Sequence, residues 1–416
     1  MKTNKYKNIA FIFVASVIVF SIMLFNFFMD PYNVFKNKTD MDFYGIPRNY
    51  AHILLKAYRN ITCDTIVIGS SNVNTLFKFD NFFSHFFNRI CINSTSYKEQ
   101  YLLLKDYLHF HPETKNAYII LCYPVFLNHE GEPISKLEGE KLNLKELAFL
   151  FFSKETTQRS ITKFKYRKYY KETFDKNNIY YYPENIKFEF EYYPNTIPDL
   201  RISKEMQQKL KNENIEYFKK IINLLKEKNI NYTIIIPSYH AIYQSMIFEI
   251  PYMKETIEGL KRLCVKMSEN DVYDFSVVNK YTTHDIINNN YLYVDLVHPN
   301  YVMGLKIFKV FHDNISERDM YVKLNKRNIE QQIKYQNKLI SDYDKNNKDT
   351  VSKYMNFYEN NPDVDKEYFE WKNFNNAPDY VTQELDSYQK SFKNFNLIHH
   401  QGKRIKKGYF KNKIWF

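Results

Sequence analysis

The chain has 416 residues, of which 44% are hydrophobic and 25% are charged, so it can bury a core and is not disordered throughout. Its 8 glycines and 13 prolines exclude collagen-like and glycine-rich low-complexity proteins. The 4 cysteines are too few and too scattered for a disulfide-stapled scaffold, and no C-x-x-C pair indicates zinc. The net charge of +12 suits an anionic partner, but no nucleic-acid-binding motif accompanies it, and no nucleic acid is expected as a partner.

The N-terminal region predicts a single membrane-spanning helix. Residues 9–29 carry no charge, and at about 1.5 Å per residue a helix of this length crosses a hydrocarbon core of about 30 Å. Lysines at positions 2, 5 and 7 precede the run and Asp30 follows it, so the positive-inside rule places the N-terminus in the cytoplasm and the main domain outside. A cleaved signal peptide is the competing interpretation, but its apolar core is usually shorter, which favours an uncleaved anchor.

Short apolar stretches alternate with helical ones after a juxtamembrane segment at residues 31–60. Strands are expected at residues 65–68, 89–92, 117–121, 232–236 and 272–275, and helices at 96–110, 203–229, 253–267 and 301–311. Ser96, three residues before Glu99, is expected to cap the first of these helices. The alternation indicates βαβ units and therefore an α/β fold with a parallel sheet between two helical layers. Such sheets bind ligands at the carboxyl ends of their strands.

Four regions follow from this pattern. Residues 1–30 form the cytoplasmic N-terminus and anchor, residues 31–60 the juxtamembrane segment, residues 61–318 the α/β domain, and residues 319–416 a polar, partly helical, basic extension. An insertion at about residues 127–200 interleaves basic and aromatic side chains, which suits stacking on sugar rings or binding an anionic chain. A solvated surface lobe explains the same composition. The basic end of the extension is typical of a solvated tail that touches anionic lipid or cell wall.

Two motifs carry candidate chemistry. The first predicted strand ends at Gly69, and the turn that follows presents a serine hydroxyl at the carboxyl edge of the sheet. A serine there is placed as a nucleophile, and the N-terminus of the helix that follows can stabilise an anion. Asp295 and His298 lie three residues apart after the last strand of the series. A catalytic serine needs a base within hydrogen-bond reach, and that base needs a carboxylate to orient it. Each motif alone is common in proteins without catalysis.

Together, the two motifs resemble the SGNH (GDSL-like) hydrolase superfamily. The similarity extends to its membrane-anchored bacterial branch, which includes the DltD-like proteins of teichoic-acid alanylation and the AlgJ/AlgX-like proteins of exopolysaccharide acetylation. It covers roughly residues 60–125 and 200–312, together with the anchor. Ser71 lies where the family has its nucleophile, Ser70 replaces the family's Asp, and Asp295 and His298 match its D-x-x-H. The resemblance implies a flavodoxin-like, SGNH-type sheet.

Two family blocks depart from this pattern. The segment ICINSTS, with Asn93 and Ser94, occupies the second block, where the family usually has an oxyanion-hole glycine. The third block corresponds to LCYPVF and contains no Asn. The two missing donors are each worth on the order of 3 kcal/mol in comparable sites. Backbone N–H groups of Ser71 and of Asn93 or Ser94 are the expected substitutes. His240, after the fourth strand, is a candidate substrate contact, although a structural histidine fits the same position.

The resemblance implies a membrane-anchored serine O-acyltransferase or esterase acting on acyl groups of a cell-surface polysaccharide. Its expected partners are the glycan, the lipid bilayer around residues 9–29 and a multi-pass membrane acyltransferase. No cofactor and no metal are implied. The alternative from another class is a catalytically impaired SGNH-fold protein that binds glycans or assists envelope assembly. A lipase or phospholipase is the third interpretation, because the anchor holds the site near lipid.

Overall fold

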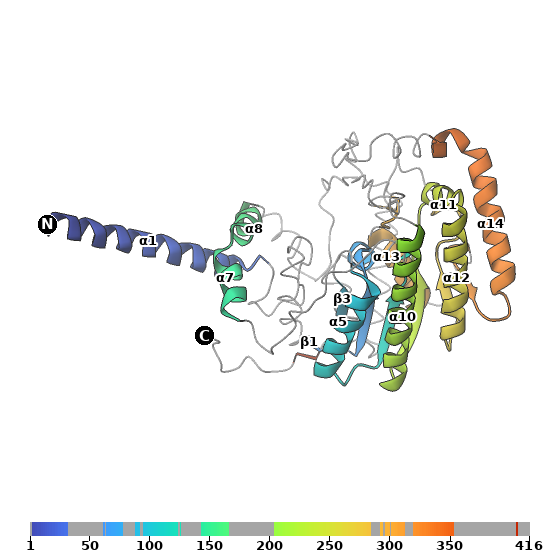
Figure 1. Cartoon of the computed structure of the whole chain (residues 1–416), viewed down its shortest axis with the longest axis horizontal. Helices are drawn as coiled ribbons and strands as arrows, with labels where there is room; N and C mark the ends of the chain where they lie inside the picture. The colour runs from blue at the N-terminus through green and yellow to red at the C-terminus, as the bar shows by residue number, and fades with distance from the viewer. Residues whose placement is uncertain are drawn as a thin grey trace.

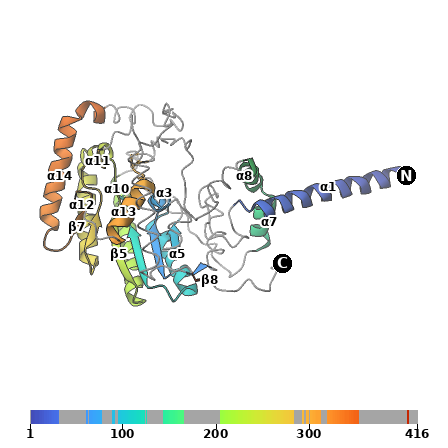
Figure 2. The same cartoon turned by 180° about the vertical axis from the view of Figure 1, so that it is seen from behind.

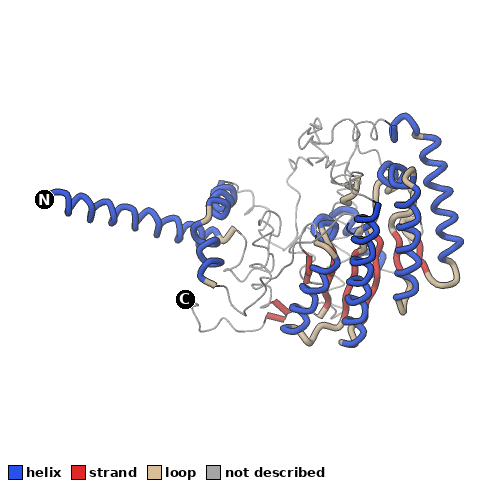
Figure 3. The backbone as a smooth tube through the Cα atoms, in the orientation of Figure 1, coloured by secondary structure: helices blue, strands red, loops and turns tan. Residues whose placement is uncertain are grey.

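The structure of the chain is a computed structural model. It describes residues 2–31, 61–62, 64–77, 88–91, 95–123, 125, 143–165, 204–283, 292–293, 296–299, 301–312, 319–352 and 405–406. A mostly parallel sheet between helices dominates the described part of the chain, and an apolar N-terminal helix extends away from it (Figures 1 and 3). The fold is therefore α/β, as the alternation of strands and helices predicts.

The main sheet has the strand order β3-β2-β4-β5-β6-β7 over the described residues. Its strands are β2 (Thr65–Gly69), β3 (Asn88–Cys91), β4 (Asn116–Ile120), β5 (Asn231–Ile236), β6 (Val272–Asp274) and β7 (Val322–Leu324). Strands β2 to β6 run parallel and β7 pairs antiparallel with β6. The first strand of the parallel set lies between the second and the third, so the connections after β2 and β3 lead in opposite directions along the sheet. Open α/β sheets bind ligands beside such a reversal of strand order.

Helices cover both faces of the sheet. Figure 1 views the face covered by α5 (Tyr97–Phe110), α10 (Lys204–Glu227) and α12 (Pro251–Met267), with α11 (Ala241–Phe248) and α14 (Ile329–Asn346) beside α12. Figure 2 views the other face, where α3 (Ser71–Leu76) lies next to α13 (Tyr301–His312). A separate two-stranded pairing joins β1 (Ile61–Thr62) to β8 (Ile405–Lys406). The core residues are those of the apolar strands and of the inward helix faces.

Local sequence explains why the central elements form where they do. Strand β2 is buried along its whole length, as expected of a continuous β-branched run that is covered on both faces. Helix α5 begins with the predicted capping box, in which the Ser96 hydroxyl accepts the Glu99 N–H and the Glu99 carboxylate accepts the Ser96 N–H at 2.8 Å. Strands β3 and β4 each begin and end one residue earlier than the sequence predicts.

Helix α1 (Lys2–Met29) contains an apolar segment, Asn8–Met29, that is long enough to cross a membrane. By length and composition, it is either a membrane anchor or a signal sequence. Its C-terminal end packs against α7 (Leu144–Phe152) and α8 (Lys154–Lys165), a helical hairpin from the predicted insertion. Most of the aromatic and basic run that characterises that insertion, residues 166–200, lies outside the described residues.

The sheet domain extends further along the chain than the sequence predicts. We expected the α/β domain to end at residue 318, but β7 adds an edge strand to the sheet and α14 packs on α11 and α12. The described residues 319–352 therefore belong to the same domain. Their polar composition suggested a separate extension, because α14 buries only a narrow stripe of its surface. That stripe includes Ile333, Ile340 and the polar Gln336.

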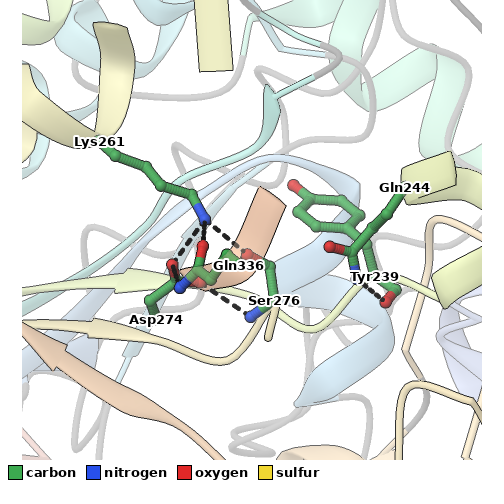
Figure 4. A network of polar contacts seen from close by, with 6 residues as sticks. All are labelled: Tyr239, Gln244, Lys261, Asp274, Ser276 and Gln336. Carbon is green, nitrogen blue, oxygen red and sulfur yellow. Dashed lines mark hydrogen bonds and ion pairs between the residues drawn. The ribbon is translucent and has the colours of Figure 1, made fainter. Parts of the chain in front are cut away.

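A buried polar network joins α12, β6 and α14 (Figure 4). The Lys261 ammonium lies 2.7 Å from Asp274 Oδ2 and 3.2 Å from Ser276 Oγ, and it also donates to Gln336 Oε1. Gln336 Nε2 in turn donates to Asp274 Oδ2 at 3.0 Å, and Ser276 Oγ donates to Asp274 Oδ1 at 2.6 Å. Every charged group in the network is thus paired and hydrogen-bonded, as burial of charge requires.

This network predicts unequal effects of two neighbouring substitutions. Lys261→Met leaves the buried Asp274 carboxylate without its cation, so we expect it to destabilise the chain by about 3–5 kcal/mol. Arg262→Met also removes a link between α12 and α14, because Arg262 pairs with Glu330 at 2.8 Å. That pair is exposed, and its loss should cost no more than about 1 kcal/mol. Urea unfolding of the full chain in detergent measures both, and equal losses would contradict a structural role for the buried network.

Candidate active site

The turn after β2 presents one of its two serines. Ser70 is completely buried, whereas Ser71, the first residue of α3, is half-buried and its hydroxyl has a partner. The turn requires glycine at position 69, because a Cβ there would lie 2.5 Å from Val73 Cγ2 and 3.1 Å from the Ile120 carbonyl oxygen. The geometry thus distinguishes Ser71, whose hydroxyl contacts a histidine, from the buried Ser70.

Ser71 and His298 form the central contact of the site. Ser71 Oγ lies 2.8 Å from His298 Nε2, across 227 positions of sequence. This distance is that of a good hydrogen bond. When Nε2 accepts a hydrogen bond from the Ser71 hydroxyl, this ring nitrogen carries no hydrogen of its own and is placed to act as a general base. A serine hydroxyl held against an imidazole in this way is the arrangement that activates a nucleophile.

The loop that carries His298 is held at both of its described ends. Tyr293 and Pro299 form an antiparallel bridge, and the buried Leu296 accepts a hydrogen bond from the His240 N–H at 3.0 Å through its carbonyl oxygen. Tyr293 is also joined to Ser238, at the end of β5, by a hydroxyl–hydroxyl hydrogen bond. The carboxyl end of β5 therefore positions the loop, and through it His298.

His240 is a structural residue in this arrangement. Its side chain is buried, its Nδ1 accepts the Ile242 N–H at 3.2 Å as the N-cap of α11, and its ring meets Tyr293 edge to face. These contacts leave little of the ring for a ligand. The sequence offered His240 as a substrate contact, and the structure favours the alternative interpretation, in which it supports the His298 loop.

Three predicted site residues lie outside the described residues: Asp295, Asn93 and Ser94. The residue next to that pair, Thr95, is described and is completely buried. Its Oγ1 donates to the Gly69 carbonyl oxygen at 3.4 Å, and its own carbonyl oxygen accepts Gln100 Nε2 at 3.3 Å. The start of α5 is thereby tied to the turn that presents Ser71. The sequence gives no signal for this role of Thr95.

The end of β4 differs in a further way from the oxyanion block that the resemblance leads one to expect. The Cys122 N–H donates to the Tyr97 hydroxyl at 3.2 Å, and the Tyr123 N–H donates to the Tyr239 hydroxyl at 3.1 Å. Burial raises the pKa of Tyr97 and of Tyr239 well above the ordinary value, so both phenols stay protonated. These two backbone N–H groups are thus engaged inside the protein, and the described residues after the carboxyl end of β4 offer neither an Asn side chain nor these amides to an oxyanion.

Gly304 sets the distance between the two helices that flank the site. Ser71 begins α3, and His298 lies just before α13, which packs against α3 (Figure 2). A Cβ at Gly304 would lie 1.8 Å from the Leu76 carbonyl oxygen, at the end of α3. Only a residue without a side chain permits this approach of the two backbones. The sequence gives no signal for this role of Gly304, because a glycine inside a helical pattern does not show what it faces.

No group of three or more His, Cys, Asp or Glu side chains that could hold a metal ion occurs among the described residues. Comparison with protein-family models and with curated protein sequences gives no match for this chain.

The close approach at Gly304 predicts a loss of reactivity on Gly304→Ala. The added methyl group must push α13 away from α3 and lengthen the Ser71–His298 contact, and a misplacement of about 1 Å costs on the order of 100-fold in rate. The rate of Ser71 labelling by a fluorophosphonate measures the effect. Gly259→Ala in α12 is the matched control, because a Cβ there meets nothing within 4 Å and the change favours the helix by up to about 1 kcal/mol. Unchanged labelling in Gly304→Ala would show that the contact does not position the pair.

Proposed function

We propose that this chain is an extracytoplasmic, membrane-anchored serine O-acyltransferase or esterase of SGNH type that acts on acyl groups of a cell-surface polysaccharide. The contact between Ser71 Oγ and His298 Nε2 at 2.8 Å is the observation that carries the proposal. It lies at the carboxyl edge of a parallel sheet, beside the reversal of strand order. The residue types, their chain order and this edge of the sheet are those that the resemblance to the family implies.

The chemistry proceeds through an acyl-enzyme. Ser71 Oγ attacks the acyl carbon of an ester while His298 Nε2 takes the hydroxyl proton, and the protonated imidazole then gives that proton to the departing alcohol oxygen. A sugar hydroxyl or water attacks the acyl-Ser71 ester next, with His298 again taking the proton, and Ser71 is released. In this scheme Asp295 orients the imidazole, and the Ser71 N–H in the first turn of α3 is one oxyanion donor.

The anchor assignment is supported by a contact that a signal sequence does not need. Asn26 Nδ2, near the end of α1, donates to the Phe151 carbonyl oxygen at 2.7 Å and to Thr157 Oγ1 at 3.0 Å. Cleavage after the apolar segment would remove Asn26 and leave the Phe151 and Thr157 oxygens without this donor. The contact therefore favours an uncleaved helix, with the lysines before it in the cytoplasm and the sheet domain outside.

An acyltransferase suits the site better than an efficient esterase. A hydrolase must stabilise a tetrahedral oxyanion during two successive attacks, and the end of β4 supplies neither of the backbone N–H groups at Cys122 and Tyr123. A bound sugar hydroxyl offsets weak stabilisation, because a positioned nucleophile reacts as though its concentration were very high. A multi-pass membrane acyltransferase that delivers acyl groups to this side of the bilayer is the partner that the resemblance implies.

The lack of free N–H groups at Cys122 and Tyr123 also favours an alternative to an enzyme. With the Cys122 and Tyr123 amides engaged by tyrosine hydroxyls, an SGNH-fold protein without turnover is the second candidate. Such a protein would bind glycan or assist envelope assembly, and it would keep the Ser71–His298 contact as an inherited structural feature.

Labelling with a fluorophosphonate separates the enzyme from this alternative. We expect covalent labelling of the full chain, and a loss of at least about 1,000-fold in the labelling rate on Ser71→Ala or His298→Ala. Ser70→Ala is the matched control, because it removes a neighbouring buried hydroxyl that has no partner among the described residues. Equal labelling of Ser71→Ala and the unchanged chain would exclude Ser71 as the nucleophile.

Acceptor dependence separates transfer from hydrolysis. We expect slow turnover of p-nitrophenyl acetate by the full chain, and a rate increase of at least about tenfold when envelope polysaccharide from the same cells is added, since a positioned acceptor replaces water. Acetyl groups should appear on the polysaccharide, and Ser71→Ala should abolish both effects. Fast hydrolysis that added polysaccharide does not change would instead identify an esterase.

A further inference from the structure

Exposed large apolar side chains gather in one part of the molecule. Of those in the described residues, all except Tyr335 belong to α1 or to the α7–α8 hairpin. The hairpin contributes Leu144, Phe152, Ile161 and Phe164. Helix α1 is exposed along most of its length and loses that exposure only near its C-terminal end, where the hairpin packs on it. Figures 1 and 2 show α1, α7 and α8 together at one side of the molecule, away from the main sheet.

Aromatic rings make the exposed apolar surface continuous from α1 to the hairpin. The Phe27 ring lies 5.7 Å from Phe28 and 6.4 Å from Phe151, and Phe151 lies 6.2 Å from Phe152. Phe28 and Phe152, the two ends of this series, are both exposed. On the α8 side, Phe164 lies 6.2 Å from Phe25. Whatever solvent surrounds the end of α1 therefore surrounds Phe152 and Phe164 as well.

Side chains of the protein satisfy several carbonyl groups at the turn between α7 and α8. The last carbonyl groups of a helix have no partner within it. Here the Phe149 carbonyl oxygen accepts from Thr156 Oγ1 at 3.0 Å, and the Phe151 carbonyl oxygen accepts from Asn26 Nδ2 at 2.7 Å. The Ser153 carbonyl oxygen accepts from Thr157 Oγ1 at 3.0 Å. Internal satisfaction of backbone groups is what apolar surroundings demand, since each unsatisfied group there costs several kcal/mol.

Asn26 places the turn close to the end of the apolar segment. Asn26 lies three positions before Met29, where that segment ends, which is about 4–5 Å along a helix axis. With α1 across a membrane, as proposed above, the Phe151 and Thr157 oxygens that Asn26 contacts would lie at the boundary between the hydrocarbon core and the headgroups. The sequence of α8, KETTQRSITKFK, carries four Lys or Arg residues against one Glu, a composition that suits anionic headgroups.

We propose that the α7–α8 hairpin lies in the interface of the bilayer that α1 crosses, with Phe152 and Phe164 in contact with acyl chains. The proposal rests on the anchor assignment made under Proposed function. The hairpin belongs to the insertion that leaves the sheet after β4 and returns at α10. It therefore connects the bilayer to the carboxyl edge of the sheet, the edge that carries Ser71, whereas the segment that follows α1 leads to the amino end of β2.

Tryptophan quenching by brominated lipid tests the proposal on the full chain. Trp371 and Trp415, the 2 native tryptophans, are replaced by Phe, and single tryptophans are introduced as Phe152→Trp, Phe164→Trp, Val17→Trp and Tyr335→Trp. The native side chains at these positions are exposed to a similar degree, by 46%, 43%, 49% and 52%. Each variant is reconstituted into vesicles of phosphatidylcholine and phosphatidylglycerol, with or without bromine on the acyl chains.

We expect bromines near the headgroup end of the chain to quench the tryptophans at positions 152 and 164, and deeper bromines to quench that at position 17. The tryptophan at position 335, on α14, should retain its emission in both lipids. Quenching at position 17 without quenching at 152 and 164 would overturn the hairpin proposal while leaving the anchor intact. No quenching at position 17 would overturn the anchor itself.

Discussion

The site depends on a close approach of two backbones. Helices α3 and α13 meet where Gly304 faces the Leu76 carbonyl oxygen, and any side chain at position 304 would collide with it. This contact sets where the segment before α13 lies relative to the turn before α3, and so brings His298 to Ser71. The bridge between Tyr293 and Pro299 and the hydrogen bond from His240 to Leu296 hold the same loop from the β5 side. A hydrogen bond of 2.8 Å across 227 positions of sequence requires such support from both sides.

Polar groups in apolar surroundings impose a second constraint, which is met in two different places. Inside the sheet domain, Asp274 is surrounded by Lys261, Ser276 and Gln336, so that no charge remains uncompensated. At the end of α1, Asn26 and the hydroxyls of the α7–α8 turn satisfy helix-terminal carbonyl groups. In both places one side chain, Asp274 or Asn26, bonds to segments that are far from it in sequence. Unpaired polar groups are costly, and this cost makes each of these associations specific.

The tyrosine contacts at the end of β4 link the fold to the proposed chemistry. Tyr97 and Tyr239 satisfy the Cys122 and Tyr123 N–H groups at the edge where the resemblance leads one to expect an oxyanion donor. These two N–H groups stabilise the fold by bonding to the tyrosine hydroxyls, and they are therefore unavailable to a substrate. The proposed acyl transfer fits this arrangement, because a bound acceptor that is positioned for attack reacts faster than unassisted water.

Sequence by itself determined the features that depend on near neighbours. The uncharged run in α1, the buried β2, the capping box of Ser96 and Glu99, and the alternation that indicates an α/β fold all follow from local patterns. The residue types at Ser71 and His298 also identified them as candidates, because their chemistry is specific and both follow strands.

Tertiary structure alone decided that these two side chains meet, and that Ser71 rather than Ser70 does so. It likewise decided that Gly304 lies against α3, that His240 supports a loop, and that β7 and α14 complete the sheet domain. These outcomes depend on backbone approach and hydrogen bonding between distant segments, and local periodicity carries no information about either.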